Sequence, residues 1–128
     1  MSKEKRISKT VMVVDDSAGI RQIISLTLQS EGYGVIEAVD GADALAKVGG
    51  GKVHLIICDV NMPNMDGISF VKEIKKSDDY KFIPVVMLTT ESQEQKKLQG
   101  QEAGVKAWIV KPFQPDQLLH VVSRLIMP

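Results

Sequence analysis

The sequence predicts an α/β fold in which helices cover both faces of a parallel β-sheet. Short apolar, β-branched runs alternate five times with amphipathic stretches along the 128 residues. Such alternation is typical of parallel strands that are joined by crossover helices. Because these crossovers are right-handed, the carboxyl ends of all strands meet at one edge of the sheet. Folds of this kind bind their ligands at that edge.

The first half of the chain contains three of the expected strands. Residues 10–14 are β-branched and predict a buried strand, and Ser17 caps the helix that follows, whose apolar residues recur at helical spacing. Residues 35–38 form a shorter strand, and Asp40 opens a second helix. Residues 53–58 are apolar enough to be covered on both faces of the sheet.

The second half supplies the remaining elements. A third helix follows the loop DVNMPNMDG, and residues 84–88 and 107–110 form the fourth and fifth strands. The expected fourth helix, residues 92–103, is polar nearly all round, so little apolar surface anchors it. Pro115 lies in the first turn of the last helix, which is apolar on more than one stripe. We expect part of that apolar surface to be exposed for a partner.

Composition limits the classes of function. Hydrophobic residues make up 44% of the chain and charged residues 25%, as in ordinary globular domains. Sixteen basic and sixteen acidic residues cancel, which argues against binding to nucleic acid or anionic membranes. Cys58 is the single cysteine and excludes an intrachain disulfide. We expect a cytoplasmic protein with an N-terminal tail (1–8) and one domain (9–128).

Polar side chains stand at the ends of four expected strands. Asp15 and Asp16 follow the first strand, Asp59 the third, Thr89 the fourth and Lys111 the fifth. Three neighbouring carboxylates repel one another, so such a site needs a cation or must take up protons. Oxygen ligands of this kind suit Mg²⁺, and a carboxylate left free can attack phosphorus to form an aspartyl phosphate. Lys111 and Thr89 would then neutralise the developing charge.

Two neighbouring residues receive structural interpretations. Thr90 is expected to be a structural neighbour of Thr89 without a part in the chemistry. Asp66, followed by Gly67, is expected to form a turn and to cap the third helix, and it is not assigned as a ligand.

These motifs together resemble the receiver domain of two-component response regulators. The resemblance rests on Asp15-Asp16, on Asp59 within DVNMPNMDG, on Thr89 and on Lys111-Pro112-Phe113, and it extends over residues 10–126. It implies a flavodoxin-like, doubly wound (βα)5 fold with five parallel strands in the order 2-1-3-4-5.

The resemblance also implies a role for each acidic residue. Asp59 is similar to the family's phosphoacceptor. The Mg²⁺ ligands would be Asp16 directly, Asp15 through water, Asp59, and the backbone carbonyl of Asn61. Asn61 and Glu91 stand two residues after Asp59 and Thr89, and this polar pair resembles the chemotaxis type, in which the phosphoryl group is short-lived.

The remaining implied roles concern switching. Thr89 would move onto the phosphoryl group, Lys111 would pair with that group, and the Lys111-Pro112 bond would be cis. Trp108 occupies the place of the family's aromatic switch residue, where tyrosine or phenylalanine is more usual.

The resemblance implies a signalling protein that catalyses only its own phosphoryl transfer and hydrolysis. Its partners would be a histidine kinase and a downstream protein that docks on the face of the fourth and fifth helices, and we expect a monomer. The target could be a flagellar motor switch protein, another kinase or a phosphotransfer protein. Two alternatives within the family stay open: a receiver excised from a longer regulator, and a phosphorelay intermediate.

Two other classes fit the sequence less well. An aspartate-nucleophile phosphohydrolase needs a second acid two residues after its nucleophile, and Ser17 fills that position after Asp15. A nucleotide- or flavin-binding domain of similar topology needs a glycine-rich phosphate loop, and no G-x-G-x-x-G opens any expected helix.

Overall fold

The computed structural model describes residues 9–90 and 94–127. Its single sheet has five parallel strands in the order β2-β1-β3-β4-β5, as predicted. The strands are β1 (Thr10–Val14), β2 (Gly34–Ala38), β3 (Leu55–Asp59), β4 (Val85–Thr89) and β5 (Ala107–Val110). The helices are α2 (Ala18–Ser30), α3 (Gly41–Lys47), α4 (Gly67–Lys76), α5 (Glu94–Ala103) and α6 (Pro115–Leu125), with a 3₁₀ turn, η1 (Val48–Gly50), after α3.

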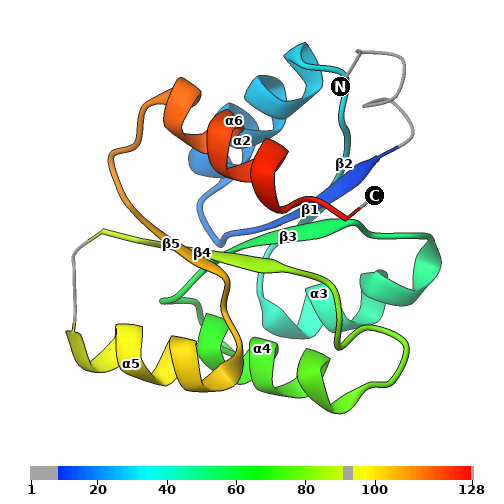
Figure 1. Ribbon diagram of the computed structural model, residues 1–128, viewed down its shortest axis with the longest axis vertical. Helices are drawn as coiled ribbons and strands as arrows, with labels where there is room; N and C mark the ends of the chain where they lie inside the picture. Colours follow the sequence, from blue (N-terminus) through cyan, green and yellow to red (C-terminus); the bar gives the residue numbers. More distant parts are fainter. Residues whose placement is uncertain (1–8, 91–93, 128) are drawn as a thin grey trace.

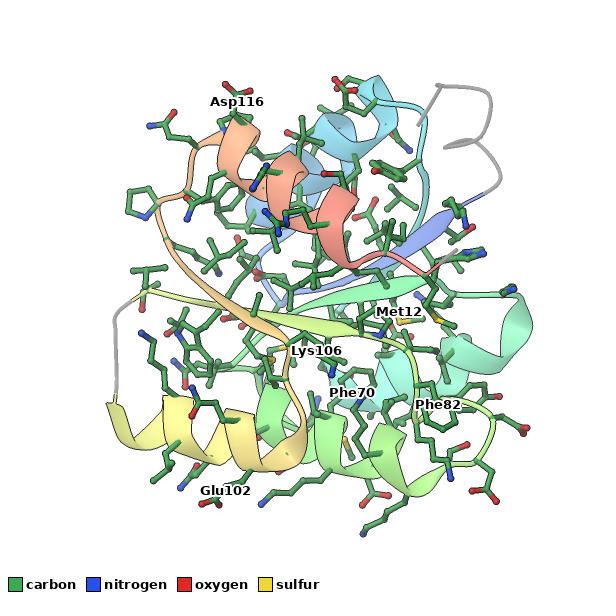
Figure 2. The ribbon with its side chains drawn as sticks, viewed as in Figure 1. Met12, Phe70, Phe82, Glu102, Lys106 and Asp116 are labelled. Carbon is green, nitrogen blue, oxygen red and sulfur yellow. The ribbon has the colours of Figure 1, made fainter. Side chains whose placement is uncertain are left out.

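The helices lie in two layers. Helices α2 and α6 cover one face of the sheet, and α3, α4 and α5 cover the other (Figure 1). Alternate side chains of the buried strands therefore enter two cores. The core beneath α3–α5 contains Met12 and Phe70, whose side chains lie between the sheet and the helices in Figure 2, while Glu102 and Asp116 lie on the outer surfaces of the two layers. This sandwich leaves the carboxyl ends of the strands uncovered by helices.

Side-chain caps fix the first turns of three helices. Ser17, Asp40 and Asp66 are the N-caps of α2, α3 and α4, and each accepts a hydrogen bond from the backbone N–H three residues later. Each cap satisfies a backbone donor that the helix leaves unpaired. The predicted starts of these helices, including the capping role of Asp66, are confirmed.

The boundaries differ from the sequence prediction in a few places. β3 begins at Leu55 instead of residue 53, and β4 runs to Thr89 instead of ending at 88. Helix α5 begins at Glu94, and Glu91 lies outside the described residues. No helix in the described part of the chain combines the length and apolarity needed to cross a membrane.

The last helix buries only part of its apolar surface. Leu118 and Val122 are buried, whereas Leu119, Val121 and Leu125 are half-buried against the core beneath α2 and α6. Helix α2 packs beside α6, but the half-buried residues keep part of the apolar surface exposed, as expected, and docking of a partner there stays a prediction. In contrast, Leu98 of α5, the helix with little apolar surface, is 57% exposed.

Candidate functional site

Three carboxylates converge at the carboxyl edge of the sheet. Asp15 and Asp16 follow β1, and Asp59 ends β3. Each offers an oxygen, and these oxygens lie within 4.8 Å of one another, which makes them a candidate metal-binding group within the described residues. Asp15 and Asp59 are buried, whereas Asp16 is exposed. The parallel topology thus brings together the acids that the sequence analysis singled out.

Two cations and a backbone amide hold Asp15 in place. The ammonium of Lys111 lies 3.0 Å from Asp15 Oδ2, and the other carboxylate oxygen accepts the N–H of Ser17 at 2.9 Å. The guanidinium of Arg21 donates to the backbone carbonyl of Asp15 at 2.7 Å. Lys111 also lies 3.7 Å from Asp59 Oδ1, so it bridges two of the three acids. The peptide bond Lys111-Pro112 is cis, as the resemblance implied.

The surroundings of Asp59 raise the pKa of its carboxyl group. Burial raises the pKa of its carboxyl above the usual range, and the charges of Asp15 and Asp16 add to that effect. The ammonium of Lys111 and a hydrogen bond from the backbone of Asn61 act in the opposite direction and lower the pKa, but they do not cancel the effect. A cation bound beside these carboxylates would lower the pKa of Asp59 again, since it favours the charged form.

The donor set fits a hard divalent cation. Three carboxylates face one ammonium, which leaves net negative charge at the site. Exposed Asp16 is accessible to an ion, whereas Asp15 already has two hydrogen-bond partners. Oxygen ligands with access to water are typical of Mg²⁺ sites.

A cavity of about 630 Å³ opens onto the carboxylates. The predicted site contributes Asp15, Asp16, Asp59, Asn61 and Lys111 to its walls, but not Thr89 or Trp108. Further lining residues were not assigned to the site from the sequence. The missed residues are Ser17, Ile20, Thr90 and Pro112. Ser17 and Pro112 directly follow predicted site residues, which could have indicated them. Thr90 lines the cavity and is exposed, whereas Thr89 is 1% exposed at the end of β4.

Gly67 lies so close to the backbone of Asp59 that position 67 has no room for a side chain. A Cβ on Gly67 would overlap the carbonyl oxygen of Asp59 and would lie 2.7 Å from Met87 Cε. The N–H of Gly67 donates to the carbonyl of Val60 at 2.9 Å. Only glycine allows α4 to begin this close to the end of β3, which explains the Asp66-Gly67 pair in the loop.

Trp108 and Thr89 share a face of the sheet. In the register of β4 and β5, Trp108 pairs with Met87, two residues before Thr89. Side chains two residues apart on a strand point to the same side, so Thr89 lies diagonally beside the indole. Trp108 is half-buried and packs against the core beneath α3–α5.

Comparisons with known proteins settle the family. The family model described as "Response regulator receiver domain" matches residues 11–123. The chain belongs to this family. Receiver domains are signalling modules that interact with histidine kinases and downstream targets, and the predicted fold and resemblance are both confirmed.

The relatives include chemotaxis proteins and transcriptional regulators. The structure of chemotaxis protein CheY4 from Vibrio cholerae is 48% identical, with a TM-score of 0.88 over 91% of this chain and 98% of that one. Chemotaxis protein CheY1 of Helicobacter pylori is 40% identical over 84% of this chain and 89% of its own length. Transcriptional regulatory protein ResD of Bacillus subtilis is 38% identical over 91% of this chain. The chain spans only 47% of ResD, about half its length.

Proposed function

We propose that the protein is a response regulator that accepts a phosphoryl group from a histidine kinase on Asp59. The observation that carries this proposal is the convergence of three carboxylates and one ammonium around an open cavity. In the transfer, an oxygen of Asp59 bonds to phosphorus while the bond from phosphorus to the donor's imidazole nitrogen breaks. The leaving imidazole takes up a proton.

Mg²⁺ is the proposed cofactor, because it would neutralise the oxygens of the phosphoryl group during transfer. Asp16 would hold it directly, and Asp15 through water. Asp59 and the backbone carbonyl of Asn61 would complete the protein's share of the ligands. Lys111 forms ion pairs with Asp15 and Asp59. After transfer its ammonium would pair with the new phosphoryl oxygens on Asp59.

The proposed output is a change in protein docking. The buried hydroxyl of Thr89 would bond to the phosphoryl group, and the indole of Trp108 would move into the space that Thr89 leaves. The surface formed by α5 and α6 would change with it and meet the downstream protein. Asn61 and Glu91 would set the lifetime of the phosphoryl group. We propose that the chain acts as a cytoplasmic monomer that does not bind nucleic acid.

Chemotaxis is the pathway that the similarities favour. The two chemotaxis relatives match this chain over 98% and 89% of their own lengths, at 48% and 40% identity. ResD and the phosphate regulon transcriptional regulatory protein PhoB of Pseudomonas aeruginosa match over about half of theirs, at 47% and 49%. Their similarity supports the second candidate, a receiver that works within a longer regulator.

A small phosphodonor tests the proposal. The native chain is incubated with acetyl phosphate, with Mg²⁺ or with a chelator, and bound phosphoryl groups are counted by intact mass. We expect Mg²⁺-dependent incorporation that disappears in Asp59→Asn.

Asp66→Asn is the matched control, since asparagine keeps the α4 cap and removes one nearby carboxylate. It should incorporate phosphoryl groups like the native chain. Undiminished incorporation in Asp59→Asn would overturn the assignment.

A further inference from the structure

We propose that Gly100 of α5 is a socket for the indole of Trp108 and holds the ring in its resting position. We further propose that this contact sets how readily the receiver switches. The socket stands on contacts within the chain alone, whereas its effect on switching rests on the function proposed above.

The contact leaves no room for a side chain at position 100 while the ring keeps its present position. A Cβ on Gly100 would lie 2.9 Å from Cζ3 and 3.5 Å from Cε3 of Trp108, whereas carbon atoms in contact are normally separated by about 3.5–4.0 Å. Gly100 is the buried residue of the stretch 97–103, the part of α5 whose side chains the structure describes. Glycine destabilises the interior of a helix relative to alanine, so this position calls for a packing reason. The indole supplies that reason.

The backbone around Gly100 is held firmly. Val105 N–H donates to the carbonyl of Gly100 at 2.9 Å, and Gly104 N–H donates to the carbonyl of Gln101 at 3.1 Å. With Gly104 at φ 101°, these bonds form the Schellman motif that ends α5. Lys106 N–H then ties the chain to β4. A new Cβ at position 100 would therefore displace the ring, which can rotate, before it displaces the helix.

The ring has freedom to respond. The indole Nε1 of Trp108 is buried and has no hydrogen-bond partner among the described residues, so shape alone holds the ring in place. A cavity of about 180 Å³ adjoins it, lined by residues of α5, of β5 and of the turn between them. Thr89 lies diagonally beside it on the same face of the sheet. The ring thus has space next to its present position.

These contacts give the socket its regulatory effect. In this proposal, the ring position against Gly100 is the resting position of the switch. The active position lies in the volume that Thr89 leaves on phosphorylation, away from the socket. An alanine at position 100 would destabilise the resting position of the ring and leave the active position unaffected, so more of the chain would adopt the active state. Because a phosphoryl mimic binds the active state better, the variant should bind the mimic more tightly.

The first experiment tests the socket without any ligand. Trp108 is the only tryptophan, so its emission and its quenching by acrylamide report the ring directly. We expect Gly100→Ala to change both. Gly19→Ala is the matched control, because Gly19 also lies in a helix but a Cβ there would meet nothing within 4 Å. Unchanged emission and quenching in Gly100→Ala would overturn the socket.

The second experiment tests the regulatory effect by calorimetric titration with beryllofluoride in Mg²⁺. Gly100→Ala should bind the mimic several-fold more tightly than the native chain, at the low end of the roughly 5–150-fold range for coupled sites. In a Trp108→Phe background, whose smaller ring does not fill the socket, the same substitution should have no effect. Equal or weaker binding by Gly100→Ala would refute the regulatory effect.

Two further outcomes distinguish an error in the proposed socket from an error in the proposed function. If Gly100→Ala does not fold, the double variant with Trp108→Phe should fold, because the obstacle is the larger ring. Failure of the double variant would overturn the socket. Absence of beryllofluoride binding by the native chain would instead refute the proposed function, and the quenching result would still decide the socket.

Discussion

Replacing Lys111 by methionine should destabilise the fold strongly when Mg²⁺ is absent. The ammonium lies 3.0 Å from Asp15 and 3.7 Å from Asp59, and the side chains of Lys111, Asp15 and Asp59 are only 12%, 1% and 10% exposed. Two unit charges about 4 Å apart interact by about 4 kcal/mol at an effective dielectric constant of 20. Removing one partner of a buried pair costs about 3–5 kcal/mol, since the other charge is left without compensation.

We therefore expect Lys111→Met to lower the free energy of unfolding by about 3 kcal/mol at neutral pH. For a domain of this size that loss corresponds to a fall in Tm of about 10 °C. The loss should shrink at acid pH, where Asp59, whose pKa is raised by burial, is protonated and no longer needs the cation.

Mg²⁺ should restore part of the lost stability. A divalent cation among the carboxylates compensates the charge that Lys111 leaves, and it no longer competes with an ammonium. Binding at a hundred times the dissociation constant contributes about 2.7 kcal/mol. The Mg²⁺-induced gain in the free energy of unfolding should accordingly be larger in Lys111→Met than in the native chain.

Urea denaturation in a chelator and in Mg²⁺ measures both effects. Lys76→Met is the control, because Lys76 pairs with Glu73 at 3.2 Å while its side chain is 73% exposed. Such surface pairs contribute about 0–1 kcal/mol. The electrostatic account of the site is refuted if Lys111→Met loses no more stability than this control, or if Mg²⁺ stabilises it no more than the native chain.

Three further predictions concern the metal, the switch and a buried histidine. Asp16→Asn should weaken Mg²⁺ binding in a calorimetric titration, because the site loses its exposed carboxylate; an unchanged titration would exclude Asp16 as a ligand. Beryllofluoride with Mg²⁺ should change the emission of Trp108 in the native chain and much less in Thr89→Ala, and an equal response in the variant would show that the coupling bypasses this hydroxyl. Burial, assisted by nearby lysines, lowers the pKa of His54 below its ordinary 6.5, and its neutral Nδ1 accepts the N–H of Thr10 at 3.0 Å. As the pH falls through about 6.5, the unfolded chain therefore takes up a proton on His54 before the folded chain does, and the free energy of unfolding decreases. His54→Asn should flatten this pH dependence between about pH 7 and pH 5. An equally steep profile in the variant would assign the pH dependence to other groups.

Much of the fold could be predicted because local pattern and topology agree. Alternating apolar runs specified the strands, and the rule that parallel strands end at one edge was enough to place Asp15, Asp59 and Lys111 together. The strand boundaries were less certain, because residues 53 and 54 are buried outside the β-ladder.

Individual packing contacts could not be predicted from the sequence pattern. Thr89 and Thr90 are chemically alike, and only the path of the chain after β4 decides that Thr90 lines the cavity. The contact between Gly100 and Trp108 depends on how closely α5 approaches β5, a distance that no periodicity encodes.

Chemical identification of the phosphorylated residue decides whether Asp59 is the phosphoacceptor. The native chain is phosphorylated with a small donor in Mg²⁺, reduced with borohydride, which converts an aspartyl phosphate to homoserine, and digested for peptide sequencing by mass spectrometry. We expect homoserine at position 59, with Asp15, Asp16 and Asp66 unchanged. Homoserine at any of those three positions in place of Asp59, or a phosphoryl group that resists borohydride, would contradict this assignment.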